Sequence, residues 1–123
     1  MKNILIVDND LGFIFWLGAA LVGAGYQLWP ACTRSDAISV ANRKPLARLH
    51  LLIVDASLPG VSKLIAHFRR TQAHLRVMAL GPQDNTLVGV TAWHTTPGSG
   101  DDSAKQEWVQ AVKHTFGRQN HAA

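Results

Sequence analysis

The sequence has little of several residues and motifs that commonly reveal function. It contains one cysteine, Cys32, which excludes an internal disulfide and a cysteine metal cluster and favours a reducing compartment such as the cytoplasm. It contains one glutamate, Glu107, and its six histidines are scattered, without an HExxH motif or metal-ligand spacing. No nucleophile and base stand in a recognisable catalytic arrangement, so we do not expect an enzyme.

Charge is absent from one long segment, since the residues from Leu11 to Thr33 include no Asp, Glu, Lys or Arg. Hydropathy alone would make such a run a candidate membrane span. Two glycines, a glutamine and a proline interrupt it after Val22, however, and the core that is left is too short, because a span needs about 20 residues. We therefore expect a buried helix. Because this helix is more apolar than one buried face requires, we expect its outer side to contact a protein partner or a second copy in a homodimer.

The overall composition is typical of a globular protein, with 47% apolar and 16% charged residues in a chain of 123. Its length predicts a single domain over residues 1–123. The net charge of +4 reflects a shortage of acid. The stretch from 43 to 76 has Asp55 as its only acid and these basic residues: Arg43, Lys44, Arg48, Lys63, Arg69, Arg70 and Arg76. We interpret them mainly as cations at helix C-termini, because aromatic residues are not interleaved with them as in a base-stacking platform; nucleic-acid contact is the less favoured alternative.

Segments of strand and helix character alternate along the chain. Continuous apolar runs predict buried strands at 3–7, 50–54 and 76–80, with further strands at 26–32 and 87–93. Helical spacing predicts helices over 11–22, 35–41, 61–68 and 104–115, the last capped by residues 101–103 and ended by Gly117. The pattern predicts an α/β three-layer sandwich around a parallel sheet. Because Pro30 has no N–H for a sheet ladder, the second strand should lie at an edge, which fits the flavodoxin-like order 2-1-3-4-5.

Two of the predicted strands are followed by an aspartate, Asp8 after the first and Asp55 after the third. In an open parallel sheet with this order, ligands bind beyond the carboxyl ends of those two strands, at the switch in strand order. Asn9 follows directly, with Asp10 as a further candidate, and such oxygen ligands suit Mg²⁺. Aspartate and asparagine also follow strands simply as turn and cap residues. That alternative would be favoured for Asp8 or Asp55 alone, but the two together at the switch point favour a binding site. Asp8 and Asp10 also end the first apolar stretch too early for a signal peptide.

Residues 4–10 (ILIVDND) and 51–60 (LLIVDASLPG) resemble the receiver domains of two-component response regulators, and the resemblance extends over nearly the whole chain. It implies the flavodoxin-like fold and a phosphoacceptor at Asp55. It also implies a weak Mg²⁺ site formed by Asp8, by Asn9 in place of a second acid, by Asp55 and by the backbone carbonyl of Ser57, with Asp10 as a stand-in. The implied partners are a histidine kinase or another signalling protein.

The sequence departs from the receiver pattern where that family holds the phosphoryl group. A receiver has Ser or Thr at the end of strand four, where this chain has Gly81, and a lysine before a proline after strand five, where it has Thr96. Each charge-assisted hydrogen bond lost costs about 1.5–3 kcal/mol, so we expect a degenerate pseudo-receiver with weak or no phosphorylation. The alternative is a competent receiver in which Thr95, Thr96 or Lys105 compensates. Trp93 stands where receivers place a switch aromatic, and without a hydroxyl at position 81 we expect it to be only packed or partly exposed.

The interval between the fourth and fifth strands is also short for a receiver. The family places a helix there, whereas residues 81–86 (GPQDNT) lead almost directly into the predicted fifth strand. We therefore expect the family's fourth helix to be shortened or absent, which removes a common output surface. The combined prediction is a stand-alone receiver-like module that acts through protein–protein interaction.

Overall fold

The computed structural model describes residues 2–43, 48–72, 74–95 and 102–117. Within them, strands and helices alternate until the fourth strand, after which β5 follows β4 without an intervening helix. The elements are β1 (Asn3–Val7), α1 (Leu11–Gly23), β2 (Gln27–Ala31), α2 (Arg34–Arg43), β3 (Leu51–Asp55), α3 (Val61–Thr71), β4 (Arg76–Leu80), β5 (Ala92–His94) and α4 (Asp102–Gly117).

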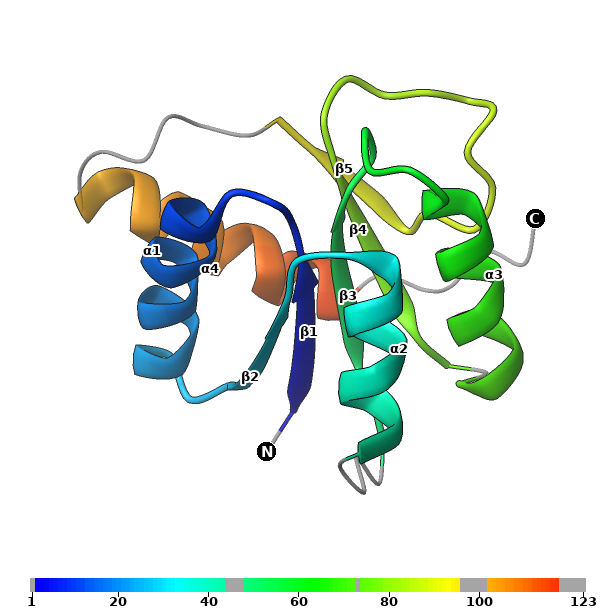
Figure 1. The fold of residues 1–123 in the computed structure, drawn as a ribbon. Helices are drawn as coiled ribbons and strands as arrows, with labels where there is room; N and C mark the ends of the chain where they lie inside the picture. Colours follow the sequence, from blue (N-terminus) through cyan, green and yellow to red (C-terminus); the bar gives the residue numbers. More distant parts are fainter. Residues whose placement is uncertain (1, 44–47, 73, 96–101, 118–123) are drawn as a thin grey trace.

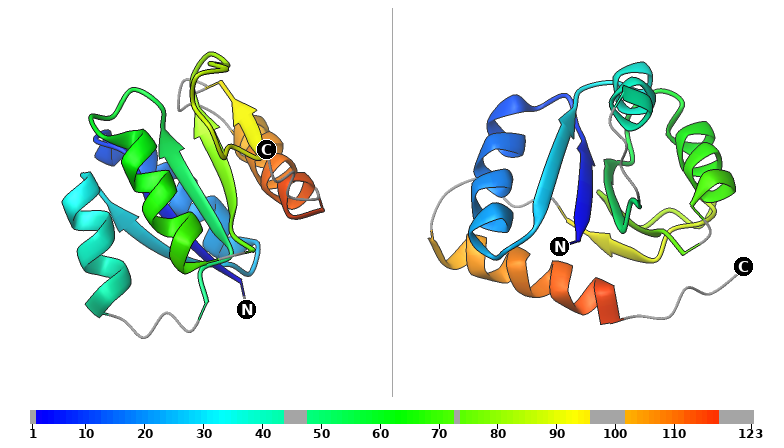
Figure 2. Two further views of the ribbon diagram at one scale, coloured as in Figure 1. Left: turned by 90° about the vertical axis from the view of Figure 1, so that its right-hand side faces the viewer. Right: turned by 90° about the horizontal axis from the view of Figure 1, so that it is seen from below.

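The strands form one parallel sheet in the order β2-β1-β3-β4-β5 (Figure 1). Helices α1 and α4 cover one face of the sheet, while α2 and α3 cover the other (Figure 2). The predicted flavodoxin-like three-layer architecture and strand order are confirmed. Strand β2, which carries Pro30, lies at an edge as expected.

Both faces of the central strands are buried, because alternate side chains of a strand point to opposite faces of the sheet. On the face covered by α1 and α4, Ile4 and Ile6 of β1 pack with Trp108 of α4 in one apolar cluster. On the other face, Leu5 and Val7 pack in a second cluster with residues of α2 and α3. This explains why the predicted central strands are apolar without alternation.

Helix α1 begins at an aspartate cap and ends at a glycine turn. The Asp10 carboxylate accepts a hydrogen bond of 3.1 Å from the backbone N–H of Phe13, and Gly25 follows the helix at φ 97°, a left-handed conformation that favours glycine. The helix runs one residue further than predicted. Among the described residues, the structure contains no helix long and apolar enough to span a membrane.

The fifth strand was predicted wrongly over 87–93, since β5 covers only Ala92–His94. Leu87, Val88 and Val90 are apolar residues typical of a buried strand, but Gly89 adopts φ 89° and the segment forms turns. All residues from 81 to 91 are described and none is helical, so the receiver-type helix at this position is absent rather than shortened. The fourth helix in chain order, α4, has 16 residues.

The connection between β4 and β5 is held against α3 by Arg69. The Arg69 guanidinium donates hydrogen bonds to the carbonyls of Gly89 and Leu75 and, at 3.3 Å, to the hydroxyl of Thr91. The Thr91 hydroxyl in turn accepts a bond of 3.0 Å from the N–H of Val77 in β4. One side chain therefore fixes a segment that has no regular secondary structure of its own.

Candidate functional site

The register of β1 and β3 brings the two predicted carboxylates to one edge of the sheet. Val7 pairs with Val54, so Asp8 and Asp55 follow at neighbouring strand ends. The Asp8 side chain is buried, and this burial raises the pKa of its carboxyl above the usual value, with the negative charges of Asp55 and Asp10 contributing less. The carboxylates are thus close enough to repel one another.

Short backbone turns hold both carboxylates in place. The Asp8 Oδ1 atom accepts a hydrogen bond of 2.9 Å from the N–H of Asp10, and this bond opposes the rise in the pKa of Asp8. The Asp55 Oδ1 atom accepts bonds from the N–H and the hydroxyl of Ser57 at 2.9 and 2.8 Å. The half-buried Asp55 is therefore oriented by the residue whose carbonyl was predicted to complete a metal site.

The remaining predicted ligands lie beside this pair. Asn9 is exposed, and its backbone N–H acts to lower the pKa of the neighbouring Asp8 carboxyl. Asp10 uses one carboxylate oxygen to cap α1, so its role as a stand-in ligand competes with its role in the helix. No group of three or more His, Cys, Asp or Glu side chains suited to a metal ion occurs among the described residues.

The chemistry of this donor set fits a hard cation, although with few charges. Asp8 and Asp55 supply two carboxylates whose mutual repulsion a divalent cation would relieve. Mg²⁺ accepts carboxylate and carbonyl oxygens and keeps several of its waters, so two carboxylates with the Ser57 carbonyl are a sufficient minimal set. The amide of Asn9 adds an oxygen without charge.

Gly81 lies next to the loop that follows Asp55, in a conformation that only glycine adopts readily. Its φ is 131°, and its N–H donates a hydrogen bond of 3.0 Å to the carbonyl of His94. A Cβ at this position would have space, since the nearest atom, the Cβ of Ala56, is 3.9 Å away. The backbone conformation, rather than crowding, therefore disfavours the Ser or Thr that the receiver pattern places here. Thr96, the other divergent position, lies outside the described residues.

Neighbouring residues of β5 face opposite sides of the sheet. Trp93 is half-buried and pairs in register with Ala79 of β4. The ring of His94 stacks on the buried Trp108 of α4, with centroids 4.1 Å apart and an interplanar angle of 27°. His94 was not predicted to have a role, because its stacking on Trp108 depends on packing between residues distant in the chain.

The sequence also did not predict a cation near the loop that follows Asp55. Gly60, in the turn that follows Asp55, has φ 76°, and a Cβ there would lie 3.0 Å from a guanidinium nitrogen of Arg34. Arg34 is the first residue of α2, so contact between two separate connections brings it over this turn. Lys105, considered above as a compensating residue, instead lines a groove between α1 and α4.

The basic stretch is distributed over the fold rather than gathered in one segment. Arg69 and Arg70 lie in the last turn of α3, as the helix-dipole interpretation predicts. Arg69 also serves as an internal donor to the β4–β5 connection. Lys44 lies outside the described residues.

Comparisons with known proteins give matches at the level of structure. No protein-family model and no curated protein matches the sequence. A response regulator from Thermotoga maritima superposes with a TM-score of 0.77 at 17% identity, covering 96% of this chain and 99% of that one. The chemotaxis response regulator CheY4 of Vibrio cholerae gives 0.74 at 18% identity, covering 94% and 98%. The receiver domain of the hybrid histidine kinase CckA gives 0.73 at 21%, covering 94% and 99%. The chain therefore has the flavodoxin-like fold found in response-regulator receiver domains.

Proposed function

We propose that residues 1–123 form a single receiver-like signalling module of the two-component type that acts through protein–protein interaction, with weak or no phosphorylation at Asp55. The observation that carries this proposal is the backbone of Gly81. It adopts φ 131° beside the Asp55 loop, where a phosphoryl group would need a hydroxyl donor. Asp55 thus has its acidic neighbour Asp8 but lacks that polar partner.

Phosphoryl transfer depends mainly on positioning and on the neutralisation of charge. In the proposed module, Asp55 supplies the carboxylate oxygen, and Ser57 orients it through two hydrogen bonds. Asp8, Asp55 and the carbonyl of Ser57 would hold Mg²⁺, which would neutralise charge on the incoming phosphoryl group. Neither Gly81 nor Thr96 replaces the hydroxyl and the cation that the receiver pattern supplies, so a phosphorylated Asp55 would be poorly stabilised.

The second candidate function is a competent receiver that accepts phosphate from a histidine kinase. The closeness of Asp8 and Asp55 favours this alternative, because it places a carboxylate that could hold Mg²⁺ beside the proposed phosphoacceptor. Arg34, over the Gly60 turn, would be available as a replacement cation. Both candidates share the fold and differ in whether Asp55 reacts.

Incubation with acetyl phosphate and Mg²⁺, followed by intact-mass measurement, separates the two candidates. For the degenerate module we expect the wild-type chain to incorporate no more phosphate than Asp55→Asn. Beryllofluoride should likewise leave the amide spectrum of both proteins unchanged. Stoichiometric modification that is lost in Asp55→Asn would establish the competent receiver and overturn our proposal.

A further inference from the structure

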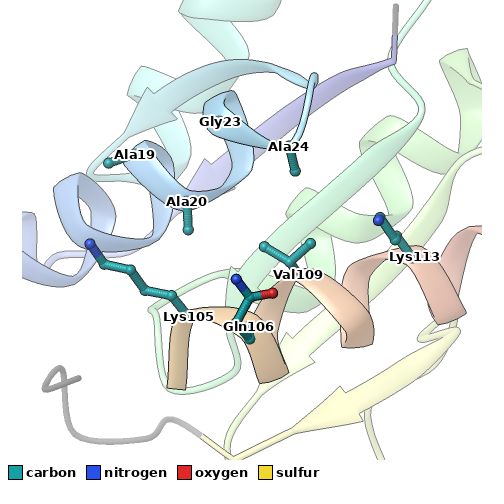
Figure 3. A pocket seen from close by; sticks show the side chains of 8 residues that line it. All are labelled: Ala19, Ala20, Gly23, Ala24, Lys105, Gln106, Val109 and Lys113. Carbon is teal, nitrogen blue, oxygen red and sulfur yellow. The ribbon is translucent and has the colours of Figure 1, made fainter. Parts of the chain in front are cut away.

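A groove runs between α1 and α4, on the face of the sheet opposite α2 and α3. It has a volume of about 470 Å³, and small residues of α1 and of its C-cap form one wall: Ala19, Ala20, Gly23 and Ala24. Lys105, Gln106, Val109 and Lys113 of α4 form the other wall. Figure 3 shows the two lysines at opposite ends of the groove, with Gln106 and Val109 between them.

The outer side of α1 continues this surface without any charge. Leu11, Phe15 and Val22 are 52%, 71% and 57% exposed, and Ala19 belongs both to this exposed stripe and to the groove. Exposed apolar side chains gathered beside a groove mark an interaction surface more than scattered ones do. The apolar wall formed by α1 therefore lies beside the positively charged wall formed by α4.

The charges on the groove specify the kind of partner. Among the residues that the structure describes, no carboxylate lines the groove, and α1 contains no charged residue, so none of the described acids faces Lys105 and Lys113 from the α1 wall. Their positions are eight residues apart on one helix, about 12 Å along its axis. Two acidic side chains seven residues apart on a partner helix lie on one face about 10 Å apart, within reach of both ammonium groups.

The dimensions favour a single helix over a second copy of the chain. Helix α1 has 13 residues and is about 20 Å long. The area of its outer face is therefore well below the roughly 800 Å² of surface that each subunit buries in a stable interface. In a two-fold dimer centred on the groove, the lysines of both copies would also approach one another. We infer that the α1–α4 groove binds an amphipathic helix of a partner protein, with small apolar residues toward α1 and acidic residues toward Lys105 and Lys113. This inference rests on the proposed function, in which the module acts through a protein partner.

The test uses the full chain and two fluorescent helical peptides of about 18 residues, long enough to be helical in part. Both carry alanine and leucine on one face; one has glutamates seven residues apart, and the other has lysines at the same positions. We expect the glutamate peptide to bind at concentrations below about 1 mM and the lysine peptide to bind at least fivefold more weakly. Equal affinity for the two peptides, or no binding of the glutamate peptide, would overturn the inference.

Two protein variants locate the binding. Gly23→Leu places a larger side chain in the wall of the groove, and folding should be preserved because a Cβ at this position meets no atom within 4 Å. Gly117→Leu is the matched control at the end of α4, where a Cβ is equally unobstructed. We expect Gly23→Leu to weaken the glutamate peptide about tenfold and Gly117→Leu to leave it unchanged. Equal effects of the two variants would show that the peptide binds elsewhere.

Charge reversal tests the partner's chemistry independently of the groove's shape. Lys105→Glu with Lys113→Glu should reverse the preference between the two peptides. Lys63→Glu with Arg70→Glu, on α3, changes the net charge equally and should not. If sedimentation instead shows a dimer that Gly23→Leu dissociates, a second copy occupies the groove and the inference is wrong. Phosphate incorporation at Asp55 is read separately, so failure here is distinguishable from failure of the proposed function.

Discussion

The Arg69 guanidinium donates a hydrogen bond to the Thr91 hydroxyl and so links α3 to the residue that precedes β5. The same guanidinium donates to the carbonyls of Gly89 and Leu75. Arg69→Met keeps most of the side-chain volume but leaves these part-buried acceptors without their donor. We expect the free energy of unfolding to fall by about 2 kcal/mol and amide exchange at 87–91 to become faster.

Arg70→Met is the control for this change, since the neighbouring Arg70 is exposed in the same turn of α3. Its effect on unfolding should stay within about 0.5 kcal/mol. Urea denaturation and hydrogen exchange of the three proteins supply the measurement. Equal losses in both variants would show that Arg69 acts only through helix charge.

Gly81 should resist replacement by the residues that receivers have at its position. Its φ of 131° is strained for any L side chain, so Gly81→Ser should lower the free energy of unfolding by about 1–3 kcal/mol. Gly23→Ser is the comparison, because a Cβ there meets no atom within 4 Å and the backbone is helical. Thermal unfolding of both variants provides the check, and a Gly81→Ser protein as stable as wild type would contradict the strain argument.

The stability of the fold should decline in mild acid because of His50. The Nδ1 atom of His50 accepts a hydrogen bond of 3.0 Å from the N–H of Asn3, which requires that nitrogen to be unprotonated. Burial lowers the pKa of His50, and the charges of Arg48 and Lys2 add to this effect. The folded chain therefore takes up fewer protons than the unfolded chain just below the ordinary pKa of about 6.5, and stability falls as pH decreases through this range.

The variant His50→Asn separates this effect from general acid denaturation, because its amide oxygen accepts the same bond without titrating. Urea unfolding at about pH 7.5 and about pH 5 should show a smaller loss for His50→Asn than for wild type. His114→Asn, on the exposed surface of α4, should behave like wild type. A loss of the same size in all three proteins would exclude His50 as the cause.

Mg²⁺ should stabilise the folded chain through Asp8 and Asp55. Burial and the negative charge of Asp55 disfavour the ionised form of Asp8 and raise its pKa. A cation between the two carboxylates would offset both effects, because it stabilises the ionised forms. We expect about 10 mM Mg²⁺ to raise the Tm of wild type and to have little effect on Asp8→Asn or Asp55→Asn. Asp84→Asn, in the β4–β5 connection, is the control and should keep the response. A response that persists in Asp8→Asn would place the cation elsewhere.

The parts of the structure that were predictable from sequence depend on local pattern. Central strands such as β1 and β3 are continuous apolar runs, and Pro30 indicated the edge strand, so the strand order and the adjacency of Asp8 and Asp55 followed. The error at β5 arose because Leu87, Val88 and Val90 are apolar like the residues of a buried strand, while a left-handed glycine and a distant arginine decide the conformation of this segment.

The parts that were not predictable depend on contacts between segments far apart in the sequence. Arg34 reaches the Gly60 turn only because α2 and α3 lie side by side on one face. His94 finds Trp108 only across the sheet–helix interface. The sequence also does not reveal the φ of a glycine. It showed that Gly81 lacks a hydroxyl, but not that the backbone conformation at this position disfavours a residue that carries one.

The two edge strands of the sheet affect how the protein behaves at high concentration. An unpaired edge strand is a template onto which other chains add strands, and this addition starts many aggregates. Here one edge strand carries Pro30, which has no backbone N–H, and the other has only three residues. The fold thus offers little backbone for cross-β assembly, and concentrated solutions of the folded chain should resist fibril formation.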